Sequence, residues 1–238
     1  QNFPRLHYND YEIINLGRGW AGVPLYTAMY LDYVESHSPP KVLVIETHFF
    51  DYAGTGRKQG IVQNVFSNRI ADAVSAEISY TENVMREIIW CSRYNELNFV
   101  AAIGGIFLEN SRNFISSKMV MDEKIIGFSK ENSEKIFFRE QNKILLKHLV
   151  QKLDLSKTRL LFVTTPVWGN ANDRFDNFEE FVAQVDKFSE ELGVEHLNFS
   201  DWSDEMKYFR DTTHLNQMGA KRFSEDFFNR IAENGLSN

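Results

Sequence analysis

Two unbroken apolar runs constrain the fold of this 238-residue chain more than any other feature of its sequence. Residues 41–46 read Lys-Val-Leu-Val-Ile-Glu, and residues 159–165 read Arg-Leu-Leu-Phe-Val-Thr-Thr. Apolar runs without polar alternation are typical of strands covered on both faces in a parallel sheet. The sequence Val-Glu-His-Leu-Asn-Phe predicts a further strand at 194–199. Because helical patterns alternate with these strands, the sequence predicts an α/β fold, a three-layer α/β/α sandwich with a mostly parallel sheet.

Three helical patterns accompany these strands. Residues 23–37 carry apolar side chains at helical spacing and stop before Pro39 and Pro40, which cannot continue a helix. Residues 134–153 and 175–192 predict two amphipathic helices. The first has its apolar positions at Ile136, Phe137, Ile144, Leu145, Leu149 and Leu153, and its solvated face at Lys143, Lys147 and Lys152. The second has its apolar positions at Phe178, Phe181, Val182, Val185 and Phe188.

The N-terminal part of the chain predicts a βαβ unit. Residues 11–15 are typical of a short strand, and residues 16–22 of a glycine-rich turn. The helix at 23–37 and the strand at 41–46 then follow, which completes the strand–helix–strand order of such a unit.

Composition and charge exclude several classes of function. The net charge of −7 argues against a nucleic-acid partner, because binding a polyanion needs a basic surface. The single cysteine, Cys91, excludes an internal disulfide, and its apolar neighbours favour a buried structural thiol. No cysteine and histidine residues are spaced as metal ligands, and no apolar stretch is long enough to predict a membrane-spanning helix. Gln1 begins the chain without a signal-like segment, so we expect a fragment or a processed chain.

Residues 53–133 interrupt the regular alternation of strands and helices. They open with Ala-Gly-Thr-Gly-Arg-Lys-Gln-Gly, a flexible loop sequence, and helical patterns follow near 62–76 and 81–93. We expect residues 1–238 to form a single α/β domain with a helical cap inserted at 53–133. This cap would act as a lid or acceptor-binding surface over a site, or else complete the packing of the domain.

The strongest chemical signal lies near the C-terminus, where residues 209–220 read Phe-Arg-Asp-Thr-Thr-His-Leu-Asn-Gln-Met-Gly-Ala. Asp211 and His214 precede a predicted helix that Asn216 would cap and whose apolar face carries Phe223, Phe227 and Ile231. A carboxylate that fixes the tautomer of an imidazole produces a general base. In the alternative interpretation, Asp211 caps a turn and His214 caps the start of the helix.

The string Asp-x-x-His-Leu-Asn-x-x-Gly-Ala at 211–220, followed by Phe223 and Ser224, resembles the last conserved block of the SGNH (GDSL-type) hydrolases. It looks most like the branch of envelope proteins that transfer D-alanyl or acetyl groups to polysaccharides. The resemblance implies a flavodoxin-like α/β sandwich and serine-based hydrolysis or transfer of an acyl ester. It makes His214 the general base and Asp211 its orienting group, and it implies neither a metal nor an organic cofactor.

The glycine-rich turn supports two interpretations. Asn15-Leu-Gly17-Arg-Gly19 resembles the second SGNH block, in which a glycine amide helps to form an oxyanion hole. Asn15, Gly17 and Gly19 are therefore candidate oxyanion or substrate-binding residues. The spacing Gly17-x-Gly19-x-x-Gly22 also matches the dinucleotide-binding fingerprint, and Glu46 ends the next strand, slightly later than the acidic residue of that fingerprint. A dinucleotide-binding domain is the corresponding alternative function.

Two more places contribute candidate site residues. Many SGNH enzymes carry Gly-x-Asn-Asp after the strand that corresponds to 41–46, but residues 47–51 read Thr-His-Phe-Phe-Asp. Thr47 or His48 could replace the missing asparagine as an oxyanion donor; alternatively, His48 is half-buried and bonded to a carbonyl group. Trp168, in the loop after residues 159–165, could line a sugar site or cover the edge of the sheet.

The nucleophile block of the family, a strand that ends in Gly-x-Ser, is missing. Ser92, Ser116 and Ser117 lie in the irregular region 53–133, without a buried strand before them. We expect the nucleophilic serine to come from a segment upstream of Gln1, so that residues 1–238 alone would lack esterase activity. In the alternative, the lineage lost the serine and kept the fold for binding.

The resemblance also implies a substrate and a location. The substrate would be an acylated cell-envelope carbohydrate or a similar small-molecule ester, and the protein would be periplasmic or extracellular, with a membrane anchor upstream of this chain. The main alternative is a non-catalytic carbohydrate-binding or scaffold protein on the same fold. The sequence carries no sign of a particular oligomeric state.

Overall fold

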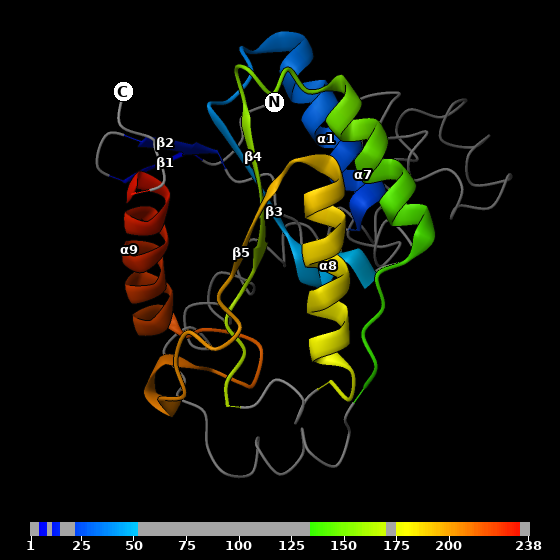
Figure 1. The fold of residues 1–238 in the computed structure, drawn as a ribbon. Helices are drawn as coiled ribbons and strands as arrows, with labels where there is room; N and C mark the ends of the chain where they lie inside the picture. The colour runs from blue at the N-terminus through cyan, green and yellow to red at the C-terminus, as the bar shows by residue number, and fades with distance from the viewer. Residues whose placement is uncertain (1–4, 9–10, 15–21, 52–133, 170–174, 234–238) are drawn as a thin grey trace, which may run out of the picture. The chain divides into compact units, whose positions relative to one another are not determined.

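A computed structural model of the chain describes residues 5–8, 11–14, 22–51, 134–169 and 175–233 (Figure 1). The chain divides into two compact units. The first comprises Gln1–Ala102, Phe137–Phe162 and Gln184–His196, and the second comprises Ile103–Ile136, Val163–Ala183 and Leu197–Asn238. Three elements contribute residues to both units: strands β4 (Arg159–Thr164) and β5 (Glu195–Asn198) and helix α8 (Phe178–Leu192).

The described strands include a three-stranded parallel sheet. Its order is β3-β4-β5, with β3 at Val42–Glu46. The central strand β4 is buried at every residue after Arg159, as its unbroken apolar run predicted. The α/β class of the fold is therefore confirmed, and the parallel sheet with its helices is compatible with the predicted three-layer sandwich.

In the first unit, helices α1 (Val23–Ser36) and α7 (Glu140–Lys152) lie side by side (Figure 1). Proline in the first turn of α1 has no N–H of its own, so the helix start has one donor fewer to satisfy. The helix ends before the predicted stop at 38–40. The buried face of α7 carries Asn142, Leu146 and Leu149. Ile144, predicted on the apolar face, is instead 56% exposed, because it lies on another side of the helix.

Aromatic rings fill the core of the first unit. The ring of Phe50 stacks on Phe138 at 4.7 Å between centroids and meets Phe162 of β4 edge-on at 5.2 Å. Phe138 in turn meets Phe188 of α8 edge-on at 5.0 Å. The buried Asn142 side chain donates to the carbonyl oxygen of Phe50 at 2.8 Å, so the polar group in this apolar core is hydrogen-bonded.

The helix predicted at 134–153 begins later than expected, at Glu140. Residues 134–139 are not helical. Ile136 and Phe138 are 3% and 5% exposed, whereas Phe137 between them is 51% exposed. This alternation has the period of two that belongs to an extended chain, so the placement of Ile136 and Phe137 on a helix is wrong.

Strands β1 (Arg5–Tyr8) and β2 (Tyr11–Ile14) form an antiparallel pair of their own. Tyr8 lies opposite Tyr11, which leaves two residues between the strands. The strand expected at 11–15 is present, but β2 pairs with β1 and β3 lies in the other sheet, so the predicted βαβ unit is wrong. The overlooked signal is Asn9-Asp10, because asparagine and aspartate both favour turns.

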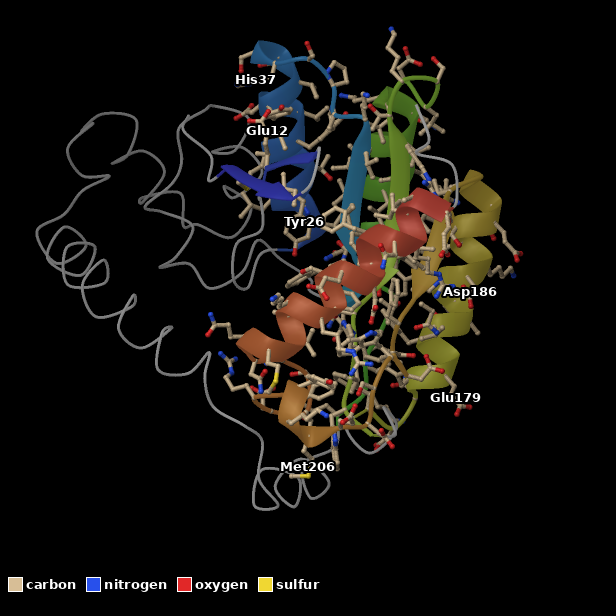
Figure 2. The ribbon with its side chains drawn as sticks, turned by 90° about the vertical axis from the view of Figure 1, so that its left-hand side faces the viewer. Glu12, Tyr26, His37, Glu179, Asp186 and Met206 are labelled. Atoms are coloured by element: carbon tan, nitrogen blue, oxygen red, sulfur yellow. The ribbon has the colours of Figure 1, made fainter. Side chains whose placement is uncertain are left out.

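In the second unit, helix α9 (Gln217–Glu233) follows the short helix η4 (Met206–Tyr208) and contacts it. Figure 2 labels Met206 at η4, near the first turn of α9. The predicted apolar face of α9 is confirmed at Phe223 and Phe227, whose rings lie 5.1 and 6.0 Å from that of Phe199. Ile231, the third member of this face, is 3% exposed. Phe199, the residue that follows β5, thus packs against the helix that follows the Asp-x-x-His motif.

The predicted cap at 53–133 lies outside the described residues, and the prediction of a single domain stays a prediction. None of the helices in the described ranges combines the length and the apolar character needed to cross a membrane.

Candidate functional site

Residues 208–216 of the second unit form a short closed turn that carries the Asp-x-x-His motif. Phe209 and Leu215 make an isolated antiparallel bridge. Inside this bridge, the backbone N–H of Arg210 donates to the carbonyl oxygen of His214 at 2.8 Å. Outside it, the N–H of Asn216 donates to the carbonyl oxygen of Tyr208 at 2.9 Å. The two ends of the motif are therefore held together by the backbone.

Asp211 closes the tip of this turn. Its Oδ1 accepts hydrogen bonds from the backbone N–H groups of Thr213 at 3.0 Å and of His214 at 2.9 Å. Aspartate favours this local arrangement because its short side chain reaches backbone groups two and three residues ahead. The alternative interpretation, in which Asp211 caps a turn, is thus correct for this residue. It does not exclude a second role for the same carboxylate.

The same carboxylate contacts the imidazole of His214. The distance between Asp211 Oδ1 and His214 Nδ1 is 2.8 Å. An ionised carboxylate oxygen can only accept, so Nδ1 carries the proton and Nε2 of the neutral ring keeps its lone pair. The side chain of His214 is 62% exposed, and Nε2 has no hydrogen-bond partner within the described part of the chain. The nitrogen that could accept a proton is therefore accessible.

The charge state of Asp211 suits this arrangement. Partial burial raises the pKa of its carboxyl group, but the hydrogen bond and charge of His214, the Thr213 N–H and the Arg210 guanidinium outweigh that effect. The net result is a pKa well below the ordinary value of 3.8. The carboxylate consequently stays ionised at neutral pH, as a group that orients an imidazole and stabilises its cation must be.

Asn216 anchors the motif to helix α9. Its Oδ1 accepts from the N–H groups of Met218 and Gly219, both at 3.0 Å, which confirms the predicted N-cap. Its Nδ2 donates to the carbonyl oxygens of Lys207 at 2.7 Å and of Phe209 at 3.3 Å. Because Asn216 is only 3% exposed and uses both ends of its amide, the helix start and the turn are one rigid assembly.

Trp168 supports the turn from the loop after β4. Its backbone N–H donates to the carbonyl oxygen of Thr212 at 3.0 Å, between Asp211 and His214 in the sequence. Its indole N–H donates to the carbonyl oxygen of Asp204 at 2.7 Å, and its ring packs against Tyr208 and Phe209. The structure thus brings Trp168 next to the motif as a support, and the indole N–H is already used.

Two further carboxylate–histidine pairs occur in the first unit. His196 Nδ1 lies 2.6 Å from Oδ1 of Asp186, an α8 residue labelled in Figure 2, and His48 Nδ1 lies 2.5 Å from Glu46 Oε1. The side chains of His196 and His48 are 2% and 18% exposed, against 62% for His214. Among these three imidazoles, His214 is by far the most accessible to a substrate.

The remaining predicted residues are placed only in part. Thr47 is fully buried in the short helix η1 (Thr47–Asp51), whose backbone follows β3 directly. His48 is half-buried, as the alternative interpretation expected, and its Nδ1 lies next to the carboxylate of Glu46. Asn15, Gly17 and Gly19 lie outside the described residues, as do Cys91, Ser92, Ser116 and Ser117.

Two residues next to the motif were missed from the sequence. Thr213 Oγ1 lies 3.3 Å from Asp211 Oδ1 and 3.2 Å from His214 Nδ1, and Arg210 Nε lies 3.4 Å from Asp211 Oδ2. Both are sequence neighbours of Asp211 or His214, so spacing alone gives no signal of their side-chain contacts. In the described ranges, no group of three or more histidine, cysteine, aspartate or glutamate side chains could hold a metal ion.

In comparisons with known proteins, no family model matches this sequence, and no curated protein matches it as a relative.

Proposed function

We propose that the protein is an SGNH-type serine esterase or acyltransferase, in which His214 is the general base and Asp211 orients it. The observation that carries the proposal is the 2.8 Å contact between Asp211 Oδ1 and His214 Nδ1, combined with the 62% exposure of the His214 side chain. This is the geometry that a base needs in order to take a proton from a hydroxyl nucleophile. The sequence resemblance at 211–220 points to the same chemistry.

The reaction follows from these two side chains. Nε2 of His214 takes the proton of a serine hydroxyl as its oxygen attacks the ester carbonyl carbon, and Asp211 stabilises the imidazolium that forms. The imidazolium then gives the proton to the departing alkoxide, which leaves an acyl-enzyme. Water or an acceptor hydroxyl attacks this ester in turn, and Nε2 takes its proton. Nε2 then returns that proton to the serine oxygen as the bond between this oxygen and the acyl group breaks. The acyl group is thereby hydrolysed or transferred, and the serine is regenerated.

The serine and the oxyanion donors of this scheme lie outside the described residues. Thr213 carries a hydroxyl group next to the imidazole, but this group lies at Nδ1, the nitrogen that faces the carboxylate. A nucleophile must lie at Nε2 instead. We assign stabilisation of the oxyanion to the backbone amides around Asn15, Gly17 and Gly19, because this stretch resembles the family block in which a glycine amide helps to form an oxyanion hole.

We propose an acylated carbohydrate of the cell envelope as the substrate, and a periplasmic or extracellular location. The support for this class is the resemblance of residues 211–220 to the envelope branch of the family. The rival function is a carbohydrate-binding or scaffold protein on the same fold, for which Nε2 of His214 would have no nucleophile to activate. The two functions differ in whether His214 affects turnover.

The test compares hydrolysis of p-nitrophenyl acetate and of an O-acetylated oligosaccharide by the natural protein that contains residues 1–238. We expect His214→Gln to lower kcat by roughly 10²- to 10⁴-fold. Asp186→Asn is the matched control, because it alters a carboxylate–histidine pair whose imidazole is 2% exposed, and it should leave kcat unchanged.

Three outcomes of this test would contradict the proposal. The first is equal turnover by the natural protein and its His214→Gln variant. The second is the same loss of activity in Asp186→Asn. The third is no turnover at all by the natural protein together with intact binding of the acetylated oligosaccharide, which would establish the scaffold function.

A further inference from the structure

We infer that Arg210 is a positioning residue, which fixes the rotation of the Asp211 carboxylate through Oδ2 and thereby aims the imidazole of His214. This inference rests on the proposed function for its catalytic consequence, but the contact itself does not depend on any activity. Arg210 Nε lies 3.4 Å from Asp211 Oδ2.

The two oxygens of the carboxylate have separate partners. Oδ1 accepts from two backbone N–H groups, those of Thr213 and His214, and from the His214 ring. Oδ2 faces Arg210. Because a carboxylate is planar and turns about the bond to Cβ, partners on both oxygens restrict that rotation more than partners on one. When this rotation is restricted, the lone pairs of Oδ1 stay directed toward Nδ1 of His214.

The backbone holds Arg210 in place for this contact. Its N–H donates to the carbonyl oxygen of His214 at 2.8 Å, so the first residue of the turn is tied to the imidazole-bearing residue. Phe209, just before it, is fully buried against the core of the second unit. The Arg210 side chain itself is only 31% exposed. The guanidinium therefore starts from a fixed Cα and has limited freedom to leave Asp211.

Other charged groups near the motif are engaged with one another. Lys207 pairs with Glu205, and Arg222 contacts Glu205 at 3.5 Å and donates to the Tyr208 hydroxyl. Asp226 accepts from the indole N–H of Trp202 at 2.7 Å. Arg210 supplies a permanent positive charge next to Asp211, and His214 adds a second one when its ring is protonated. Removing Arg210 should consequently leave the carboxylate both less restrained and less stabilised as an anion.

The experiment is a pair of measurements on Arg210→Gln, Arg210→Lys and Arg222→Gln. The first is the titration of the Asp211 side-chain carboxyl by carbon NMR, and the second is kcat and KM for the acetylated substrate. Arg210→Gln should move the titration of Asp211 to higher pH and lower kcat about tenfold at nearly constant KM. Lysine retains the charge but not the Nε geometry, so Arg210→Lys should restore the titration fully and kcat only in part.

Arg222→Gln removes an equal charge from the same unit and should change neither the titration of Asp211 nor kcat. The inference is overturned if Arg210→Gln leaves the Asp211 titration and kcat as they are in the natural protein, or if Arg222→Gln reproduces both effects. Should Arg210→Gln fail to fold, a kcat of Arg210→Lys equal to that of the natural protein would also overturn it. A shifted titration in a protein without esterase activity would refute the proposed function and leave the Arg210–Asp211 coupling established.

Discussion

Gly219 lies directly against the carbonyl oxygen of Tyr208. A Cβ atom at position 219 would lie 2.0 Å from that oxygen and 2.9 Å from its carbonyl carbon. The same oxygen accepts the N–H of Asn216 at 2.9 Å, so it cannot move without disturbing the start of α9. The first turn of the helix and the chain that leads into the Asp-x-x-His motif thus meet at backbone distance.

This contact makes Gly219→Ala destabilising, although alanine is the better helix former. We expect a loss of about 3 kcal/mol in the free energy of unfolding, since backbone must shift to admit the methyl group. Gly193→Ala is the comparison: its φ of +64° disfavours alanine, but no neighbour lies within 4 Å of the added Cβ. That variant should lose only about 1 kcal/mol. Urea unfolding of both variants measures the two losses of stability. A loss for Gly219→Ala that is smaller than the loss for Gly193→Ala would contradict this prediction.

Asn177 holds the extended segment before α7 by two hydrogen bonds. Its Oδ1 accepts from the N–H of Ile136 at 2.9 Å, and its Nδ2 donates to the carbonyl oxygen of Ile136 at 2.8 Å. Asn177→Ala should cost about 2 kcal/mol of stability, since each bond contributes about 1 kcal/mol.

Asn177→Asp is the sharper variant, because it keeps the acceptor and replaces the donor with an anionic oxygen that faces a carbonyl group. We expect Asn177→Asp to be less stable than Asn177→Ala at pH 7 and to recover relative to it at pH 3, where the carboxyl is protonated. Thermal unfolding at the two pH values tests this order. Identical pH dependence in the two variants would show that the Ile136 contact does not form.

Arg159 and Glu195 form an ion pair between the first residues of β4 and β5. Arg159 Nε and Nη2 lie 3.2 and 2.5 Å from Glu195 Oε2, and the side chains are 22% and 34% exposed. A double-mutant cycle with Arg159→Gln and Glu195→Gln should give a coupling free energy of about 1 kcal/mol.

The control for this cycle is the pair Lys147–Glu191, which is separated by 3.8 Å and about half exposed on both sides. Its coupling should be near zero, because water and salt screen an exposed pair. Equal couplings for the two pairs would mean that the shorter distance and greater burial of the Arg159–Glu195 pair add nothing to its strength.

The depressed pKa of Asp211 predicts a dependence of stability on pH. A carboxyl group whose pKa is lowered by folding contributes stability that is present above its unfolded pKa and lost as the pH falls toward the folded value. Asp211→Asn keeps an acceptor for the Thr213 and His214 N–H groups but has no charge. Its deficit in unfolding free energy should be full at pH 7 and should shrink below pH 3.8, the ordinary value for this group.

Asp211→Ala provides the contrast, because it removes the turn cap as well as the charge. The part of its deficit that comes from the lost cap should persist at low pH. Chemical unfolding of the three proteins between pH 7 and pH 2 makes the comparison. A deficit of Asp211→Asn that grows as the pH falls would contradict the charge assignment.

Local patterns in the sequence predicted much of the fold. The apolar run of β4 and the buried face of α8 at Phe178, Phe181, Val185 and Phe188 are confirmed, because each lies within one element whose period the sequence shows directly. The pairing of β2 with β1 was not predicted, because strand partners depend on contacts outside the element. The late start of α7 was missed because a short stretch such as Ile136-Phe137-Phe138 fits an extended chain as well as a helix.

In the candidate site, too, local contacts could be predicted from the sequence and features that depend on distant residues could not. The contact between Asp211 and His214 was predictable, since a spacing of three residues across a turn brings such side chains together. The exposure of His214 and the near-complete burial of His196 were not, because exposure is decided by packing against distant residues. The contact of Arg210 with Oδ2 likewise depends on how the turn directs adjacent side chains, and spacing does not specify that direction.

The closed turn at 208–216 has a consequence for how the motif forms during folding. The bridge between Phe209 and Leu215 and the contact between Asp211 and His214 both join residues that are at most six positions apart. Closing so short a loop loses little chain entropy and is fast compared with the assembly of parallel strands. The contact between Asp211 and His214 can therefore form early in folding, before the parallel sheet assembles. Later folding steps then need only bring the nucleophile to an imidazole whose orientation is already fixed.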